Sequence, residues 1–273
     1  MKIINYEGIH MNKNPIDIAK FAAKEAGKII LRSMGNIQKM QVENKIDFDF
    51  VTKIDKNSEN KIIELIRSSF PDHSIMAEES GEHDNVSRYT WVIDPLDGTN
   101  NYIHGFPFFS VSIALFDRDD IIMGVVYDPI RQELFHAEKG KGSFLNDCAI
   151  RVSDIKDPGR SLIGTGFPFK NKDYLGKYMK SFAEVFEHVS GVRRPGSAAL
   201  DLSYVACGRL DGFWEAKLSP WDISAGILLV IEAGGVVTDF SGGTNYFDSE
   251  ELLIGNPSIH EFLLNEVKPV LGD

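Results

Sequence analysis

Cysteine is scarce: Cys148 and Cys207 are the only two in this chain of 273 residues. They lie far apart, and neither belongs to a Cys-x-x-Cys pair of the kind that binds metal. This pattern disfavours a secreted scaffold held together by disulfides, and a reducing cytoplasm is the expected compartment. We interpret both side chains as ordinary buried thiols.

Long apolar segments are also missing. No window approaches the roughly 20 apolar residues that a membrane-spanning helix needs. Residues 1–13 interrupt their short apolar steps with Lys2, Glu7 and Lys13, so they lack the continuous apolar stretch of a signal peptide. We therefore expect neither a leader nor a membrane partner.

Basic residues are outnumbered, because 29 lysines and arginines face 40 aspartates and glutamates, and the formal net charge is −11. Binding to a nucleic-acid backbone requires a basic face, and none is visible in the sequence. We expect no direct nucleic-acid partner. The same acidity would repel a phosphate substrate unless bound metal cations offset it.

Hydrophobic residues make up 43% of the chain, which is enough to bury a large core. Asn14-Pro15 is typical of a helix start, and apolar residues then follow at helical spacing until Gly35. A second helix is predicted over residues 56–68. The chain can therefore fold as one large domain or as two tightly fused halves.

Beyond these helices the pattern indicates strands. Apolar runs that predict strands cover residues 74–77, 90–93, 108–116, 121–127, 133–137 and 140–144. The polar stretch 154–160 contains Pro158-Gly159, and we place a boundary there. The later part alternates strands over 161–166, 211–215 and 236–239 with helices over 173–188, 197–206 and 222–233. This is an α/β layered pattern, with an N-terminal half (1–155) and a C-terminal half (156–273).

A turn rich in acids follows the strand predicted at 90–93, with the sequence Asp94-Pro95-Leu96-Asp97-Gly98-Thr99. Pro95 cannot donate to a strand ladder, so we expect the backbone to turn there. Asp94 and Asp97 would then be close enough to share a divalent ion, with the carbonyl of Leu96 as a further ligand. The two residues after Asp97 would offer backbone N–H groups to a phosphate. An ordinary turn with a solvated acidic pair is the alternative.

Two further acids favour the metal interpretation. Glu78 ends the strand predicted at 74–77, so neighbouring strands would bring its carboxylate to the same sheet edge as Asp94. Asp222 introduces an apolar helix, where capping is the simpler interpretation. Without metal, gathered acids would raise one another's pKa values, and bound divalent ions would reverse that cost.

Three segments carry a resemblance that extends over nearly the whole chain. They are Ala77-Glu78-Glu79-Ser80, Trp91-Val92-Ile93-Asp94-Pro95-Leu96-Asp97-Gly98-Thr99-Asn100-Asn101-Tyr102 and Trp221-Asp222-Ile223-Ser224-Ala225-Gly226. In order and spacing they closely resemble the signature segments of the inositol monophosphatase family, and residues 164–169 and 193–202 are similar to its bacterial branch. The resemblance implies a layered αβαβα sandwich of the sugar phosphatase type. It also implies a homodimer, with the active site between the two halves of each chain.

The same resemblance implies a ligand set for two or three Mg²⁺ ions. Glu78, Asp94 and the Leu96 carbonyl would hold the first ion. Asp94, Asp97 and Asp222 would hold the second, and a weaker third ion would lie beside Glu78.

Catalytic and substrate roles are implied in the same way. Asp49 matches the family's acidic residue that pairs with the motif threonine, here Thr99, to orient the attacking water, and Glu78 is the third catalytic candidate. A plain turn acid is the alternative for Asp49. Glu215 can accept hydrogen bonds from two vicinal hydroxyls, although an exposed acid at a strand end is an equal alternative. The full set of substrate contacts is Asp97, Gly98, Thr99, Gly196, Ser197, Ala198 and Glu215.

The implied reaction is in-line attack by metal-activated water on a sugar or cyclitol phosphate, with inositol 1-phosphate as the leading substrate. The chain has no Cys-x5-Arg loop, which argues against a cysteine phosphoenzyme. Fructose-1,6-bisphosphatase and histidinol-phosphate phosphatase activities on the same fold are the close alternatives. Inhibition by lithium is implied by the family. A regulatory or scaffold protein that retains a phosphatase fold is the alternative of another class.

Overall fold

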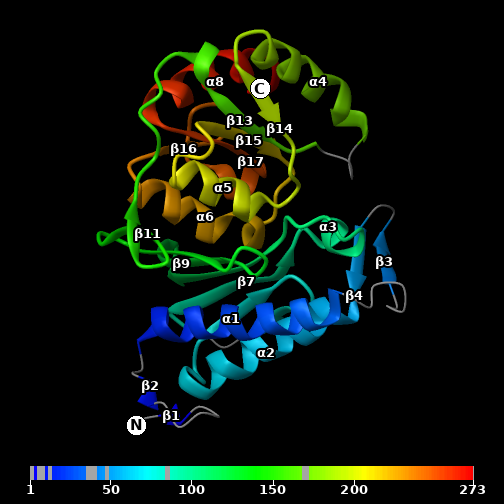
Figure 1. Cartoon of the computed structure of the whole chain (residues 1–273), viewed down its shortest axis with the longest axis vertical. Helices are drawn as coiled ribbons and strands as arrows, with labels where there is room; N and C mark the ends of the chain where they lie inside the picture. The colour runs from blue at the N-terminus through cyan, green and yellow to red at the C-terminus, as the bar shows by residue number, and fades with distance from the viewer. Residues whose placement is uncertain are drawn as a thin grey trace.

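The computed structural model describes residues 3–4, 10–11, 14–34, 42–46, 49–83, 87–167 and 172–272 (Figure 1). Its helices are α1 (Pro15–Ser33), α2 (Lys53–Ser69), α3 (Thr99–Ile103), α4 (Lys172–Phe186), α5 (Ala198–Ala206), α6 (Pro220–Glu232), α7 (Tyr246–Ser249) and α8 (Pro257–Leu271). A short 3₁₀ turn covers Pro158–Arg160.

Two mixed sheets contain most of the strands. The larger sheet has the order β12-β11-β10-β9-β8-β7-β5-β6, and the smaller has the order β14-β13-β15-β17-β16. Two separate strand pairs, β1-β2 and β3-β4, complete the described strands. The bounds are β1 (Ile3–Ile4), β2 (His10–Met11), β3 (Val42–Ile46), β4 (Asp49–Thr52), β5 (Ser74–Ala77), β6 (Gly81–His83), β7 (Tyr89–Asp97), β8 (Ser110–Asp117), β9 (Asp120–Asp128), β10 (Glu133–Glu138), β11 (Gly142–Leu145), β12 (Cys148–Ile150), β13 (Leu162–Thr165), β14 (Gly191–Arg193), β15 (Gly212–Ala216), β16 (Val236–Thr238) and β17 (Glu251–Gly255).

Helices and sheets alternate in layers (Figure 1). The helices α1 and α2 cover one face of the larger sheet, α5 and α6 lie between the two sheets, and α4 and α8 pack together on the outer side of the smaller sheet. The predicted αβαβα sandwich is confirmed. This arrangement places the start of α6 where it can meet the residues that follow the strands of the larger sheet.

The first two helices form as the sequence predicts. Asn14 is extended at φ −89° and ψ 124°, and Pro15 opens the first turn of α1. Ala19, Ala22 and Ala26 share a fully buried face, which belongs to the core that also includes residues of α2.

Strand β7 alternates its side chains between two cores. Trp91 and Ile93 belong to the core shared with α1 and α2, whereas Val92 belongs to the core shared with α5 and α6. Burying a side chain such as Ile93 stabilises the fold by about 1.5–3 kcal/mol. The strand is therefore fixed on both faces up to the first acid of the motif.

The turn predicted at Pro95 is wrong in one respect, because β7 continues to Asp97. Its pairing with β8 shifts register between Asp94 and Asp97. This irregularity accommodates Pro95, whose nitrogen cannot donate to the ladder. The bulge, instead of a chain reversal, sets the directions of the two aspartates.

The interpretation of Cys148 as a buried thiol is also wrong. Cys148 is exposed on β12, at the edge of the larger sheet, and Cys207 is half-buried. Both thiols are free. Among the described residues, no helix combines the length and apolar character needed to cross a membrane.

Candidate active site

Three of the predicted acids meet at one edge of the larger sheet. Strands β5 and β7 are parallel neighbours with Ala77 opposite Ile93, so both deliver their next residue to the same edge. The backbone N–H of Glu78 donates to the carbonyl of Ile93 at 3.1 Å. Glu78 therefore lies beside Asp94, as the strand pattern predicts.

Asp94 lies at the centre of this acidic group. Its side chain is only 2% exposed, and its Oδ1 accepts a hydrogen bond from the N–H of Leu96 at 2.9 Å. Burial raises the pKa of Asp94 well above its usual range, and the charges of Glu78, Asp97 and Asp222 raise it further. A hydrogen bond between Asp94 and Glu78 acts in the same direction.

Asp97 is held by the second half of the chain. Its Oδ2 accepts hydrogen bonds from the hydroxyl of Ser197 at 2.5 Å and from the N–H of Ala199 at 2.8 Å. Burial raises the pKa of Asp97 to about 6, while these hydrogen bonds act to lower it. The first turn of α5 thus fixes this carboxylate in the acidic group.

Asp222 is a capping residue, as the simpler interpretation predicts, and its role as a metal ligand stays a prediction. It is the third residue of α6, and its Oδ2 accepts a hydrogen bond from the N–H of the N-cap residue Ser219 at 2.7 Å. Burial raises its pKa well above the usual range, and the charges of Asp97 and Glu78 add to that effect. Asp222 is therefore a capping residue that also faces the acids of the larger sheet.

The chemistry of this donor set fits Mg²⁺. Carboxylate and carbonyl oxygens are the ligands that this hard cation prefers, and a divalent ion would remove the mutual repulsion. As the side chains stand, no group of three or more acids, histidines or cysteines in the described ranges is arranged to hold a metal ion. Protein donors engage one oxygen of each of Asp94, Asp97 and Asp222, and each carboxylate has a second oxygen that can bind an ion.

Thr99 begins α3 beside this group. Its hydroxyl lies 3.0 Å from Oδ1 of Asp55 and 3.0 Å from the carbonyl oxygen of Leu96. Asp55 is fully buried in the first turn of α2. The buried Leu96 carbonyl, predicted as a metal ligand, is thus within hydrogen-bonding distance of Thr99.

Asp55 is a residue that the sequence reasoning missed. Asp49 and Asp55 lie only six positions apart in the sequence. The contact of Asp55 with Thr99 follows from its place in the first turn of α2, which the sequence pattern did not reveal. Asp49 belongs to β4, but its side chain lies outside the described residues, so its pairing with Thr99 stays a prediction.

Gly98 and the segment 196–198 are brought together. Gly98 has φ +91°, and a Cβ there would lie 3.1 Å from the carbonyl oxygen of Gly196, so glycine is favoured on both counts. The side-chain nitrogen of Asn101 donates to the carbonyls of Pro195 and Gly196 at 2.8 and 3.2 Å. The substrate contacts predicted at Gly196, Ser197 and Ala198 therefore border the acidic group.

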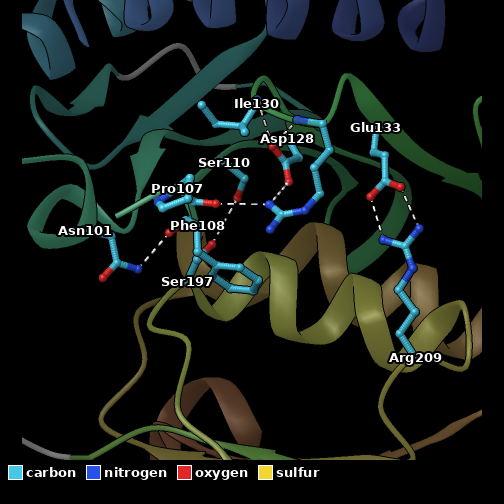
Figure 2. Close-up of polar contacts among 10 residues, drawn as sticks. Asn101, Pro107, Phe108, Ser110, Asp128, Ile130, Glu133, Ser197 and Arg209 are labelled. Carbon is cyan, nitrogen blue, oxygen red and sulfur yellow. Dashed lines mark hydrogen bonds and ion pairs between the residues drawn. The ribbon is translucent and has the colours of Figure 1, made fainter. Parts of the chain in front are cut away.

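Figure 2 shows further polar contacts at the same junction. The hydroxyls of Ser110 and Ser197 lie 3.3 Å apart, which joins β8 to the start of α5. Asn101 points toward Phe108 and donates to its carbonyl at 2.7 Å. The loop before α5 is thus tied to the larger sheet at several points.

A family model for the inositol monophosphatase family matches residues 12–271. The chain belongs to the inositol monophosphatase family. Among its curated relatives, Nus factor SuhB of Escherichia coli (strain K12) is 45% identical over 259 residues, which are 94% of this chain and 97% of that protein.

Solved structures of family members agree with the fold. The extragenic suppressor protein suhB from Bartonella henselae has a TM-score of 0.90 and 43% identity, and covers 92% of this chain and 97% of its own. The inositol monophosphatase from Anabaena (Nostoc) sp. PCC 7120 has a TM-score of 0.81 and 41% identity, with 93% and 95% covered. The inositol monophosphatase fold is therefore shared along almost the entire chain.

Glu215, on β15 of the smaller sheet, lies near the acidic group described above. Its side chain is partly exposed in the molecular surface. Burial of its carboxyl raises the pKa to about 8; the Arg194 charge opposes this shift, and the Asp97 charge adds to it. The charge of Glu215 also raises the pKa of Asp222, so the predicted substrate residue and the predicted metal ligands share one electrostatic environment.

Asp201 is a second residue that the sequence reasoning missed. It lies on α5, is 1% exposed, and its Oδ1 has no hydrogen-bond partner among the described residues. Burial, then the charges of Glu215 and Asp97, raise its pKa well above the usual range, and Arg194 opposes this. On a small apolar helix such an aspartate gives no sequence signal that separates it from an ordinary surface acid.

Proposed function

We propose that this chain is a magnesium-dependent phosphomonoester hydrolase of the inositol monophosphatase type. One observation carries the proposal: Asp94 and Asp97 of the larger sheet are buried next to Asp222 of α6, and the charges of Asp97 and Asp222 raise the pKa of Asp94. Such a group of charges is costly unless it serves a cation. Family membership supports the same conclusion.

The acidic residues would bind the metal ions needed for hydrolysis. Glu78, Asp94, Asp97, Asp222 and the Leu96 carbonyl would hold Mg²⁺. When bound, Mg²⁺ supplies charge neutralisation for the phosphoryl oxygens and activation of water.

Residues beside the acids would orient the reactants. Thr99, whose hydroxyl is shared between Asp55 and Leu96, would accept and direct a water proton toward the carboxylate of Asp55. Asp49 is proposed to assist this step, as the family resemblance implies. The backbone at Gly98 and Thr99 would position the phosphate.

The alcohol part of the substrate would face the second half of the chain. Glu215 would accept hydrogen bonds from two vicinal hydroxyls, and Gly196, Ser197 and Ala198 would line the same side. Inositol 1-phosphate has vicinal hydroxyls that could donate these hydrogen bonds. Fructose 1,6-bisphosphate and histidinol phosphate are the alternatives, because the acids determine the phosphoryl chemistry whereas a few contacts select the alcohol.

A phosphate-release panel with Mg²⁺ tests this proposal. We expect inositol 1-phosphate to give the highest kcat/KM of the three esters, with activity lost on chelation and reduced by millimolar-range lithium. Absence of release from all three esters would reject the hydrolase. A preference for one of the other two esters would retain the chemistry and replace the substrate.

A second candidate function is a regulatory role of the Nus-factor type. Several curated relatives, 43–46% identical over nearly the whole chain, carry the name Nus factor SuhB. These names support the regulatory alternative better than inositol-1-monophosphatase as the main role. With a net charge of −11, we propose a protein partner for this role instead of direct contact with nucleic acid.

The substitution Asp97→Asn separates the two functions. It removes a charge from the acidic group while keeping an oxygen that Ser197 and Ala199 can reach. If hydrolysis is the biological role, the variant should lose both activity and the ability to complement a deletion strain. If the role is regulatory, the inactive variant should still complement that strain. The matched control is Asp119→Asn, in an exposed turn between β8 and β9.

Assembly and location complete the proposal. We propose a homodimer in the cytoplasm, supported by the family resemblance and by the two free thiols. Analytical ultracentrifugation at micromolar protein should give about twice the chain mass of 30.5 kDa. A species at the single-chain mass would contradict the dimer.

A further inference from the structure

Gly166 lies directly beneath the carboxylate of Glu215. Strands β13 and β15 are parallel with Thr165 opposite Trp214, so Gly166, which follows β13, is a neighbour of Glu215, the next residue of β15. A Cβ on Gly166 would lie 1.7 Å from Oε1 and 1.8 Å from Cδ of Glu215. The carboxylate therefore occupies the space that any larger side chain at position 166 would need.

The backbone does not itself require glycine at this position. Gly166 is not among the residues with positive φ, unlike Gly98 and Gly196, so an alanine can adopt its conformation. The clash would fall on the far end of a flexible side chain. An alanine at 166 should consequently leave the fold intact and displace the carboxylate of Glu215.

The backbone beneath the carboxylate is held firmly. The hydroxyl of Thr165 lies 2.8 Å from the hydroxyl of Tyr178 and 3.0 Å from the carbonyl oxygen of Trp214. Tyr178, on α4, also donates to the carbonyl of Trp214 at 2.9 Å. These bonds tie β13, β15 and α4 together, so the side chain of Glu215 would move in preference to the backbone at the end of β13.

The place that Glu215 occupies is electrostatically part of the site. The charge of Asp97 raises the pKa of Glu215 and the charge of Arg194 lowers it, while the charge of Glu215 raises the pKa of Asp222. Displacement of the carboxylate would therefore change the hydrogen bonds available to the hydroxyls of the substrate, while the acids on β7 keep their positions.

We propose that Gly166 is a specificity-determining position, which selects polyol phosphates by leaving room for the carboxylate of Glu215. The inference rests on the proposed hydrolase function and deepens it. Gly166 touches no substrate in this scheme; it acts through Glu215 and is a positioning residue. Its replacement should weaken recognition of hydroxyls and spare the phosphoryl chemistry.

The test compares Gly166→Ala with two substrates, inositol 1-phosphate and p-nitrophenyl phosphate, whose leaving group carries no aliphatic hydroxyl. We expect kcat/KM for inositol 1-phosphate to fall by about 10- to 100-fold, chiefly through KM, as for loss of the hydrogen bonds from two vicinal hydroxyls. The value for p-nitrophenyl phosphate should change by less than about twofold. Gly176→Ala is the matched control, because a Cβ at that position on α4 meets nothing within 4 Å.

A double variant shows whether Gly166 acts through Glu215. If it does, Gly166→Ala should cost little more once Glu215→Gln is present, so that the two effects are strongly non-additive. Full additivity would overturn the inference. An equal loss on both substrates would also overturn it, because that pattern indicates general damage.

The outcomes also separate this inference from the proposed function. A wild-type chain that hydrolyses neither ester rejects both. A wild-type chain that is active, with Gly166→Ala unchanged on both esters, rejects only the role of Gly166. A crystal structure of Gly166→Ala provides a readout other than activity: a displaced Glu215 carboxylate supports the inference, and an unmoved one overturns it.

Discussion

Ser197 donates a 2.5 Å hydrogen bond to Oδ2 of Asp97, a residue 100 positions earlier in the chain. Ser197 is the N-cap residue of α5, yet its hydroxyl makes no capping bond to that helix. The hydroxyl instead joins the second half of the protein to the acidic group. The position of Asp97 thus depends on a contact that neither half makes alone.

Removing this hydroxyl should affect both activity and its pH dependence. The hydrogen bond from Ser197 lowers the pKa of Asp97, so Ser197→Ala should raise that pKa above about 6. We expect a loss of about tenfold in kcat/KM at pH 6, equivalent to about 1.4 kcal/mol, and partial recovery at higher pH. Ser181→Ala, which removes a buried hydroxyl bonded within α4, should leave the pH profile unchanged.

Thr99 and its neighbouring acids can be tested as a unit. Thr99→Ala should reduce kcat by about 10²–10⁴-fold, as for loss of a proton-transfer group, whereas Thr99→Ser should retain most activity. Asp55→Asn should resemble Thr99→Ala, because Thr99 hydrogen-bonds to Asp55. Full activity in Asp55→Asn, with loss in Asp49→Asn, would assign the role to Asp49 alone. Circular dichroism should check folding, since Asp55 is fully buried.

Binding of Mg²⁺ should release protons. The pKa of Asp97 is raised to about 6, and those of Asp94 and Asp222 lie well above their usual range. A cation favours the ionised carboxylates, so its affinity should rise with pH and fall as the pH drops below about 6. Calorimetric titration in two buffers with different ionisation enthalpies measures the release, and heats that do not depend on the buffer would contradict it.

Asp201→Asn should stabilise the protein at neutral pH. The raised pKa of Asp201 means that the folded state retains a proton which the unfolded chain releases. Its contribution is therefore fully present below the unfolded pKa near 3.8 and is lost as the pH rises. Asparagine removes that loss, so we expect about 1–2 kcal/mol of added stability at pH 8 and no gain near pH 3.

Urea unfolding across that pH range provides the measurement for Asp201. The control, Asp119→Asn in an exposed turn, should stay within about 0.5 kcal/mol of wild type at every pH. Destabilisation by Asp201→Asn at pH 8 would show that the carboxylate form has a role in the fold.

His260 should destabilise the fold in mild acid. Burial lowers its pKa to about 4, and its Nε2 lies 3.0 Å from the hydroxyl of Thr238. Its contribution is present above the unfolded pKa near 6.5 and is lost as the pH falls toward about 4. After allowance for solvent screening, the loss should be about 1–2 kcal/mol. His260→Gln should flatten this part of the stability profile, and an unchanged slope would assign it to other groups.

Patterns with local causes could be predicted from the sequence. The start of α1 follows from Asn14-Pro15, and β5 has the bounds that its apolar run gives. The convergence of Glu78 with Asp94 followed from strands that deliver acids at their ends. In each case a few consecutive residues carry the information.

Features that depend on tertiary contacts could not be predicted. Strand β17 and helix α8 were missed, although Asn256-Pro257 is a helix-start signal of the same kind as Asn14-Pro15. The extension of β7 to Asp97 depends on pairing with β8, and the role of Asp55 depends on the contact of the first turn of α2 with Thr99 at the start of α3. The domain boundary at residue 155 stays a prediction.

Asp222 caps α6 with the same carboxyl that faces the acids of the larger sheet. A cation bound to this carboxylate withdraws electron density from the oxygen that accepts the N–H of Ser219, so it should weaken that hydrogen bond. Binding of the cation and fraying of the first turn of α6 should then occur together. Hydrogen exchange of the Ser219 amide would therefore report how fully cations occupy the site, even in a variant that has lost its activity.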